Sequence, residues 1–202
     1  MEIIELIIDE EMDNAGIEAV SIVSEPAIEE RFIALSKQQE IKLAEVDSEK
    51  RILMGAALVP GRMIYRNGGK DKDGFYVHFS EATVRRASEL FFIKSNHINA
   101  TLEHDAPLDQ MTIVESWIIE DPEVDKSKLY GMDLPKGTWM ISMKVDDEEI
   151  WEDQVKGGLV SGFSIEGFFM DRAKQGLSVD SDEIEAENEL QKVRDIIQNN
   201  NQ

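Results

Sequence analysis

Hydrophobic and polar positions alternate with a period of two in several parts of the chain, and this period is typical of strands. Residues 19–24 alternate in this way and predict a short strand that ends before Pro26. A helix is predicted to follow over residues 27–35. The N-terminal part of the chain is therefore expected to contribute one extra strand to the main domain, with a removable or regulatory pro-segment as the alternative.

Further strands are predicted along the middle of the chain, because short apolar runs rich in β-branched and aromatic residues are separated by Gly, Pro, Asn and Asp. An apolar run over 51–66 leads through the turn-rich stretch NGGKDKDG to FYVHF. The later predicted strands are TLEHD, MTIVESWIIED, TWMISMKV and LVSGFSIEGFF. The predicted architecture is mixed, with strands dominant.

Helical spacing is found in three places. Val84, Ala87, Leu90 and Phe91 predict an amphipathic helix through the stretch SEATVRRASELFFIKS, with Ser80 as its N-cap. A short helix is predicted over 146–156, where two glycines follow and end it.

The third helix is predicted near the C-terminus. Ala186, Leu190, Val193 and Ile197 form an apolar stripe behind a cap at Ser181 or Asp182. Such a stripe docks on its own domain or associates with another chain through a short coiled coil, so a homo-oligomer is one expectation. The closing QNNNQ is predicted to be disordered.

With 202 residues, of which 42% are hydrophobic, the chain suits one main domain with short appendages. The predicted divisions are an N-terminal entry segment over 1–50, a main domain over 51–170, and an acidic linker with the C-terminal helix over 171–202.

The net charge of the chain limits the classes of partner that it can bind. The 42 acidic residues outnumber the 21 basic ones and give a formal net charge of -21, which repels nucleic acids and anionic membranes. We expect neither as a partner. The charge is explained by a solvated acidic surface or by attraction to a basic partner. A protein that mimics nucleic acid is a third explanation, but it leaves the motifs below unexplained.

Several classes of site are not expected. The chain has no cysteine, so a disulfide framework, a thiolate zinc site and a cysteine nucleophile are excluded. No apolar run approaches the roughly 18 residues of a membrane-spanning helix, and the opening MEIIELIIDEEMDN lacks a basic leader and a cleavage site, so a cytoplasmic protein is expected. No phosphate-binding glycine loop or metal-ligand cluster is visible, and we expect no cofactor and no metal.

The three histidines are the candidates for a general base. His78 lies within the predicted strand FYVHF, where a structural ring is the simpler explanation, and His97 lies in a polar loop after a helix. His104, in ATLEHDAPL, follows a short apolar strand and precedes a turn that contains proline. A side chain at such a strand end can extend over a cleft, so His104 is the candidate base.

Ser164 is the candidate nucleophile. In the segment SGFSIEGFF, Gly162, Ser164 and Glu166 point to one side of the predicted strand, and Phe163 and Ile165 point to the other. Gly162 and Gly167 bracket the serine and would leave main-chain N–H groups accessible as oxyanion donors. The simpler alternative is a serine on a half-buried strand, since spatial geometry and not sequence order defines a Ser–His pair.

A serine nucleophile needs a base, and the imidazole needs a third group that orients it. Three carboxylates compete for that third role. Glu115 lies on the strand after His104, Asp146 follows the strand TWMISMKV, and Glu166 shares the face of Ser164. We prefer Glu115 from the sequence.

Together, several segments resemble the XkdF-like branch of phage prohead (capsid maturation) serine proteases over roughly residues 52–170. These segments are ILMGAALVPGRMIYR, YVHFSEATVRRASELF, TLEHD, TIVESWIIEDPEVDKSKLYGMDLPKGTWMISMKV and GLVSGFSIEGFF. The specific feature is their order, in which a His-Asp pair is followed 60 residues later (164 minus 104) by a serine in a Gly-Phe-Ser context.

The resemblance implies an α+β fold with a β-rich, barrel-like domain similar to the herpesvirus assemblins. It matches His104 and Ser164 to the family's base and nucleophile. Two departures leave the third member open. The chain has Glu166 where wider prohead proteases often have a small residue, and it has no histidine after Ser164 to serve as the second histidine of assemblin-like enzymes.

The resemblance also implies a function, namely a serine endopeptidase that cleaves scaffold and major capsid protein segments during procapsid maturation. Such an enzyme would act in the host cytoplasm and inside the procapsid, often with processing of the protease itself. The alternative is an inactive structural or scaffold-binding capsid component of the same fold.

Overall fold

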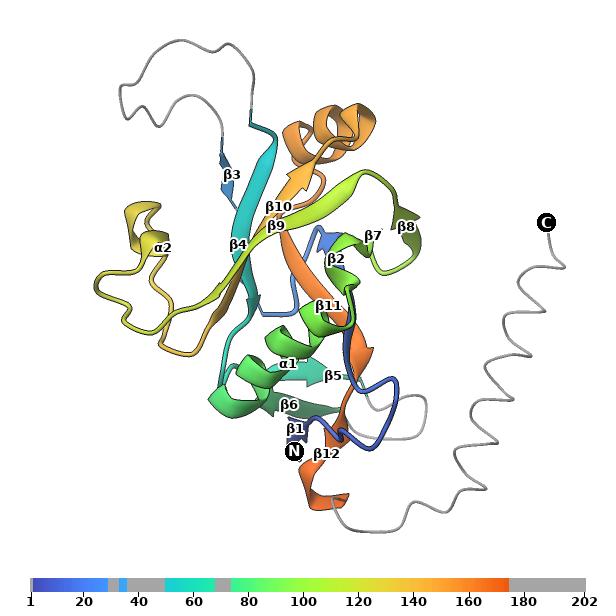
Figure 1. Cartoon of the computed structure of the whole chain (residues 1–202), viewed down its shortest axis with the longest axis vertical. Helices are drawn as coiled ribbons and strands as arrows, with labels where there is room; N and C mark the ends of the chain where they lie inside the picture. The colour runs from blue at the N-terminus through green and yellow to red at the C-terminus, as the bar shows by residue number, and fades with distance from the viewer. Residues whose placement is uncertain (1, 29–32, 36–49, 68–73, 175–202) are drawn as a thin grey trace, which may run out of the picture.

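The computed structural model of the chain describes residues 2–28, 33–35, 50–67 and 74–174 (Figure 1). Strands dominate the described part. They are β1 Ile3–Ile7, β2 Gly16–Val23, β3 Ile33–Leu35, β4 Ile52–Leu58, β5 Ile64–Arg66, β6 Phe75–Phe79, β7 Ala100–Leu102, β8 Ala106–Leu108, β9 Met111–Ile118, β10 Trp139–Val145, β11 Gly162–Phe168 and β12 Met170–Asp171. The helices are α1 Glu81–Ile93, α2 Lys126–Leu129, a π-helix Ile150–Lys156, and two 3-10 turns, Asn96–Ile98 and Arg172–Lys174.

The described strands form three four-stranded sheets, with the orders β12-β1-β6-β5, β3-β4-β10-β9 and β11-β2-β7-β8. The α+β, β-rich class is therefore as predicted. The prediction of a barrel-like domain was wrong, because the outer strands of each sheet do not pair with each other. A barrel needs every strand to have two neighbours.

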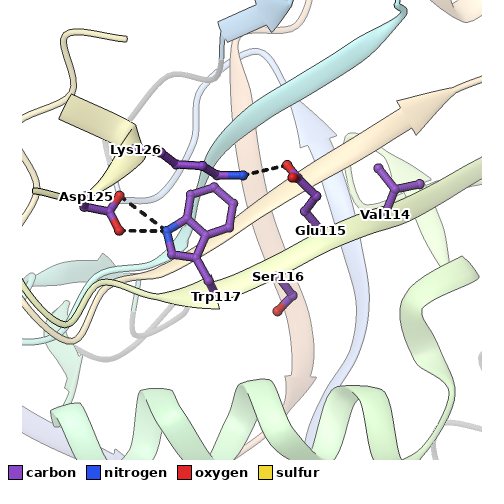
Figure 2. Close-up of a pocket in the computed structure, with 6 residues that line it drawn as sticks. All are labelled: Val114, Glu115, Ser116, Trp117, Asp125 and Lys126. Carbon is purple, nitrogen blue, oxygen red and sulfur yellow. Dashed lines mark hydrogen bonds and ion pairs between the residues drawn. The ribbon is translucent and has the colours of Figure 1, made fainter. Parts of the chain in front are cut away.

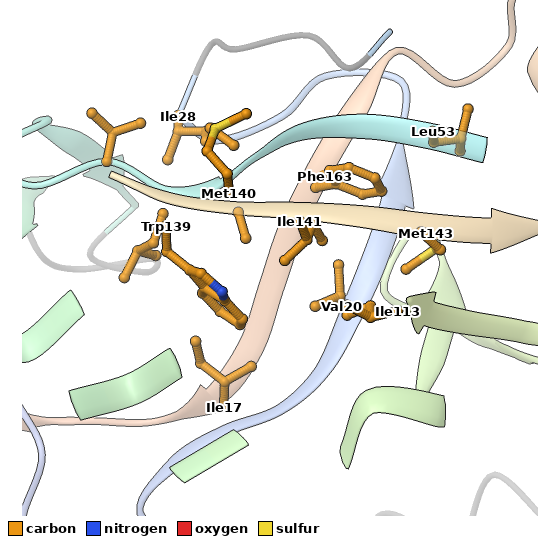
Figure 3. Packing of buried hydrophobic residues seen from close by; sticks show 14 of the residues in the cluster. Ile17, Val20, Ile28, Leu53, Ile113, Trp139, Met140, Ile141, Met143 and Phe163 are labelled. Carbon is orange, nitrogen blue, oxygen red and sulfur yellow. The ribbon is translucent and has the colours of Figure 1, made fainter. Parts of the chain in front are cut away.

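The core lies where β10, β2, β11 and α1 meet (Figure 3). Six of the seven residues of β10 are buried, which explains the nearly continuous apolar run WMISMKV. Phe91 of α1 packs edge-to-face on Trp139 of β10, with ring centroids 5.5 Å apart. Trp151 and Phe163 are also among the largest fully buried side chains. This packing holds α1 across the sheets.

Most of the predicted elements are confirmed. Helix α1 begins after Ser80, whose side chain accepts a hydrogen bond from the Thr83 amide at 3.4 Å. The predicted helix over 146–156 is a π-helix that begins later, at Ile150, and Gly158 follows it with φ +71°. Strands β1, β8, β12 and the short helix α2 were not predicted.

One element was wrong, and one lies outside the described residues. The helix predicted over 27–35 is contradicted at 33–35, which form β3 and pair with β4, so tertiary pairing overrides local pattern there. The predicted C-terminal helix falls beyond residue 174, outside the described residues. No helix in the described ranges is long and apolar enough to cross a membrane.

The N-terminal strands are built into two of the sheets. β1 pairs in parallel with β6 and antiparallel with β12. β2 lies between β11 and β7, antiparallel to the first and parallel to the second (Figure 1). A strand from the first 25 residues thus separates the strand of Ser164 from the strand that leads into His104.

Candidate functional site

A row of three hydroxyl residues crosses the sheet β11-β2-β7. Ser164 of β11 lies opposite Ser21 of β2, and Ser21 lies opposite Thr101 of β7. Residues that face each other across strands share one face of a sheet. Two strand spacings of about 4.8 Å each separate Ser164 from Thr101, so the row is about 10 Å long.

Glu166 lies on the same face as Ser164, two residues further along β11. Its cross-strand partner on β2 is Ala19. The small side chain of Ala19 leaves space for the Glu166 side chain to extend over β2 toward β7. The carboxylate oxygen Oε1 accepts a hydrogen bond from the Thr101 hydroxyl. The same oxygen lies 3.2 Å from Nδ1 of His104. Glu166 therefore joins β11 to β7 and to the imidazole.

His104 lies in a tight turn that joins β7 to β8. The Asp105 amide donates to the Leu102 carbonyl at 3.0 Å, and the two central residues, Glu103 and His104, have φ values of +52° and +61°. The connection is three residues long, 103–105, because Leu102 pairs with Ala106. Positive φ at both central residues of a tight turn usually requires glycine, asparagine or aspartate. Each left-handed residue other than glycine costs roughly 1–2 kcal/mol, so the turn needs support from its surroundings.

That support comes from β2 and the residue that follows it. The amide of Ser24 donates to the Glu103 carboxylate at 2.6 Å, and the Glu103 amide donates to the Ile22 carbonyl at 3.1 Å. The His104 amide donates to the Ser21 hydroxyl at 3.0 Å. Backbone strain held in this way is common at functional sites, and here it sets the direction in which the imidazole leaves the turn.

The three side chains differ in their access to solvent. His104 is 42% exposed and Glu166 is 30% exposed, whereas Ser164 is only 8% exposed. No hydrogen bond from the Ser164 hydroxyl is present within the described ranges, so the hydroxyl is not committed to a structural partner. The His104 imidazole is therefore accessible to solvent, whereas Ser164 is nearly buried on the same side of the sheet.

Glu115, preferred from the sequence as the third member, lies in a different sheet. Its carboxylate accepts hydrogen bonds from Lys126 Nζ at 2.7 Å and from the Ser142 hydroxyl. Figure 2 shows this surface, where Lys126 also lies 3.9 Å from the ring centroid of Trp117, and Trp117 donates to Asp125. The hydrogen bond from Lys126, with a smaller contribution from Ser142, lowers the pKa of Glu115.

The structure gives each of the three competing carboxylates a different partner. Asp146 forms an ion pair with Lys144 at 3.1 Å, and Glu115 pairs with Lys126. Glu166 is the carboxylate that the structure brings to His104. No contact with His104 supports the sequence-based preference for Glu115, because β9 belongs to a different sheet from β7 and β11. The Glu115 carboxylate pairs with Lys126 there.

The other two histidines lie elsewhere. His78 is on β6, opposite Glu5 of β1. His97 stacks on Phe92 with ring centroids 5.8 Å apart. Neither joins the row of hydroxyls. Within the described ranges, no group of three or more His, Asp or Glu side chains is arranged to hold a metal ion.

Gly167 has a structural role beside the site. A Cβ atom at this position would lie 2.1 Å from the Gly16 carbonyl oxygen, so only glycine lets β11 approach β2 this closely. The register between the two strands shifts between Glu166 and Gly167. The expected role of the bracketing glycines, access for a substrate backbone and oxyanion donors, stays a prediction.

Sequence reasoning missed Ser21 and Thr101. A signal was present for Ser21, a polar residue surrounded by Val20, Ile22 and Val23 in a strand that is otherwise apolar here. A buried hydroxyl in such a place needs a hydrogen-bond partner. The identity of that partner, the His104 amide, depends on tertiary structure alone.

Comparison with known families supports a protease. A family model described as "Putative phage serine protease XkdF" matches residues 40–172, which include His104, Ser164 and Glu166. No curated protein and no solved structure matches the chain, so the likeness to the assemblins stays an expectation. Since the match covers well over half of its length, the chain belongs to the XkdF family of phage serine proteases.

Proposed function

We propose that the protein is a serine endopeptidase in which Ser164 is the nucleophile, His104 the general base and Glu166 the residue that orients the base. One observation carries the proposal. Nδ1 of His104 lies 3.2 Å from Glu166 Oε1, on the sheet face that also holds Ser164. The family match adds the expectation of serine protease chemistry.

In the first half of the reaction, the Ser164 hydroxyl oxygen attacks the scissile carbonyl carbon and its proton passes to Nε2 of His104. The Glu166 carboxylate stabilises the imidazolium that forms. The tetrahedral intermediate collapses when His104 returns the proton to the leaving amine nitrogen, which breaks the C–N bond. The product is an acyl-enzyme ester on Ser164.

In the second half, a water molecule attacks the ester carbonyl and His104 accepts the water proton. The C–O bond to Ser164 then breaks, and the serine oxygen takes the proton back from His104. Main-chain N–H groups between Gly162 and Gly167 are the proposed donors to the oxyanion in both halves. Without a substrate, no hydrogen bond joins Ser164 to His104, and such contacts often tighten only in the substrate complex.

The proposed substrates are scaffold and major capsid protein segments, cleaved inside the phage procapsid during maturation. The net charge of -21 supports basic segments as substrates, because opposite charge speeds their encounter with the enzyme. Co-expression of the protein with the scaffold and capsid proteins of its phage tests the proposal.

Discrete cleavage products are expected with the wild type and should be lost with both Ser164→Ala and His104→Ala. Mass spectrometry of the products would give the cleavage sites. Persistent cleavage by either variant contradicts the assignment of that residue. Absence of cleavage by the wild type, with its natural substrates present, favours the inactive structural component.

A further inference from the structure

Ser21 is a buried hydroxyl residue that connects three parts of the site. Its side chain is fully buried on β2, directly beside Ser164. The Ser21 hydroxyl accepts the His104 amide at 3.0 Å and donates to the Thr101 carbonyl at 3.3 Å. Loss of this hydroxyl would leave the His104 amide without its partner.

The contact with His104 matters because the turn is strained. Both Glu103 and His104 have positive φ values, and their conformation persists only while β2 holds it. Two of the three anchoring contacts go to Glu103, and the contact from Ser21 goes to His104 itself. Release of His104 would let the residue relax and would move the imidazole away from Glu166.

We propose that Ser21 is a positioning residue of the catalytic site, and that it acts by holding the backbone of His104. The proposal rests on the proposed function. Ser21 lies on β2, outside the matched family region, which begins at residue 40. Strand β2 therefore completes a site whose other members come from within that region.

The start of β2 and the residues just before it are bound to the rest of the domain by side-chain hydrogen bonds. Lys94 at the end of α1 donates to the carbonyls of Asp13 and Ala15, and Asn96 and Asn99 donate to those of Ile17 and Glu18. Four side-chain hydrogen bonds therefore hold the backbone of residues 13–18 in place. A site that uses Ser21 requires β2 to stay in this place.

A fluorophosphonate probe, which reacts with an activated serine, tests the role of Ser21 on the full chain. The rate of Ser164 labelling should fall about 10-fold to 100-fold in Ser21→Ala, because an imidazole displaced by about 1 Å loses that much in rate. The matched control is Ser88→Ala, which also removes a largely buried hydroxyl, bonded to the Arg85 carbonyl of α1. The control should label at the wild-type rate.

A second comparison separates positioning from general destabilisation. In the Glu166→Gln background, the additional change Ser21→Ala should lower the labelling rate less than 3-fold, since both changes disrupt the same contact. Thermal unfolding confirms that each variant is folded. If Ser21→Ala does not fold, Ser21→Cys replaces it, because sulfur is only a weak acceptor.

The outcomes are distinguishable. A folded Ser21 variant that labels at the wild-type rate overturns the inference and leaves the proposed function intact. Equal losses in the wild-type and Glu166→Gln backgrounds also overturn it, since they indicate a purely structural role. A wild type that does not label at Ser164 argues against the proposed function itself.

Discussion

Glu166 on β11 and Glu115 on β9 both accept a hydrogen bond from a hydroxyl on another strand of the same sheet, Thr101 and Ser142 respectively. They differ in the basic side chain that lies beside them. Glu115 is paired with Lys126, whereas Glu166 lies beside the imidazole of His104. Imidazole is the side chain that most often accepts and returns a proton in catalysis, whereas the lysine here serves as the partner of an ion pair.

The comparison teaches that the partner decides what a carboxylate can do. The ion pair of Glu115 holds α2 against β9, where Lys126 also lies over the ring of Trp117. Its negative charge is used for structure. Glu166 can support an imidazole that changes charge during a reaction, and this is the requirement for the third member of a serine protease site.

The largest expected effect is on activity. Glu166→Gln keeps the size of the side chain and removes its charge, so cleavage of the co-expressed capsid proteins should fall about 100-fold or more. Glu115→Gln is the same chemical change in the other sheet and should cleave at nearly the wild-type rate. Time courses of product formation measure both. A larger loss in Glu115→Gln than in Glu166→Gln would restore Glu115 as the third member.

The next largest expected effect is on stability. It compares a glycine of β11, in the sheet of the candidate site, with a glycine in the turn that follows α2. Gly167→Ala would place a Cβ 2.1 Å from the Gly16 carbonyl oxygen, so the free energy of unfolding should fall by about 3 kcal/mol. Gly131→Ala, where φ is +78° and no atom lies within 4 Å of the added Cβ, should lower it by about 1 kcal/mol. Urea unfolding measures both values, and the reverse order would contradict the close approach of β11 to β2.

The smallest effect is the pH dependence of the Glu115 ion pair. Lys126 lowers the pKa of the Glu115 carboxyl in the folded state. The contribution to stability is therefore fully present above the ordinary carboxyl pKa of about 4.3 and is lost as the pH falls through the lowered value.

At pH 7, Glu115→Gln should lower the free energy of unfolding by less than about 1 kcal/mol, because the pair is half exposed and screened by solvent. The difference between wild type and variant should disappear in acid, as measured by urea unfolding at several pH values. Lys126→Met removes the same pair from the other side and should show the same loss with acid. A difference that grows in acid would contradict the assigned ion pair.

Local patterns predicted most of the fold. The period of two identified β2 and the alternating faces of β11, and apolar runs rich in β-branched and aromatic residues identified β7, β9 and β10. The helical spacing with Ser80 as N-cap identified α1. Patterns failed where neighbours decided the outcome. Residues 33–35 are paired with β4 and form a strand, and residues 106–108 form β8 despite Pro107 because they lie at the edge of a sheet.

The sequence by itself determined the two central candidates, His104 and Ser164, through their local settings and the family resemblance. It also indicated that a carboxylate is needed to orient the imidazole of His104. It did not determine which one, because Glu166 and His104 are 62 residues apart (166 minus 104) and meet only after β2 has inserted between β11 and β7. The strained turn of His104 and its support from Ser21 were likewise decided by the tertiary structure, since a hydroxyl finds its partner through strand pairing and not through sequence spacing.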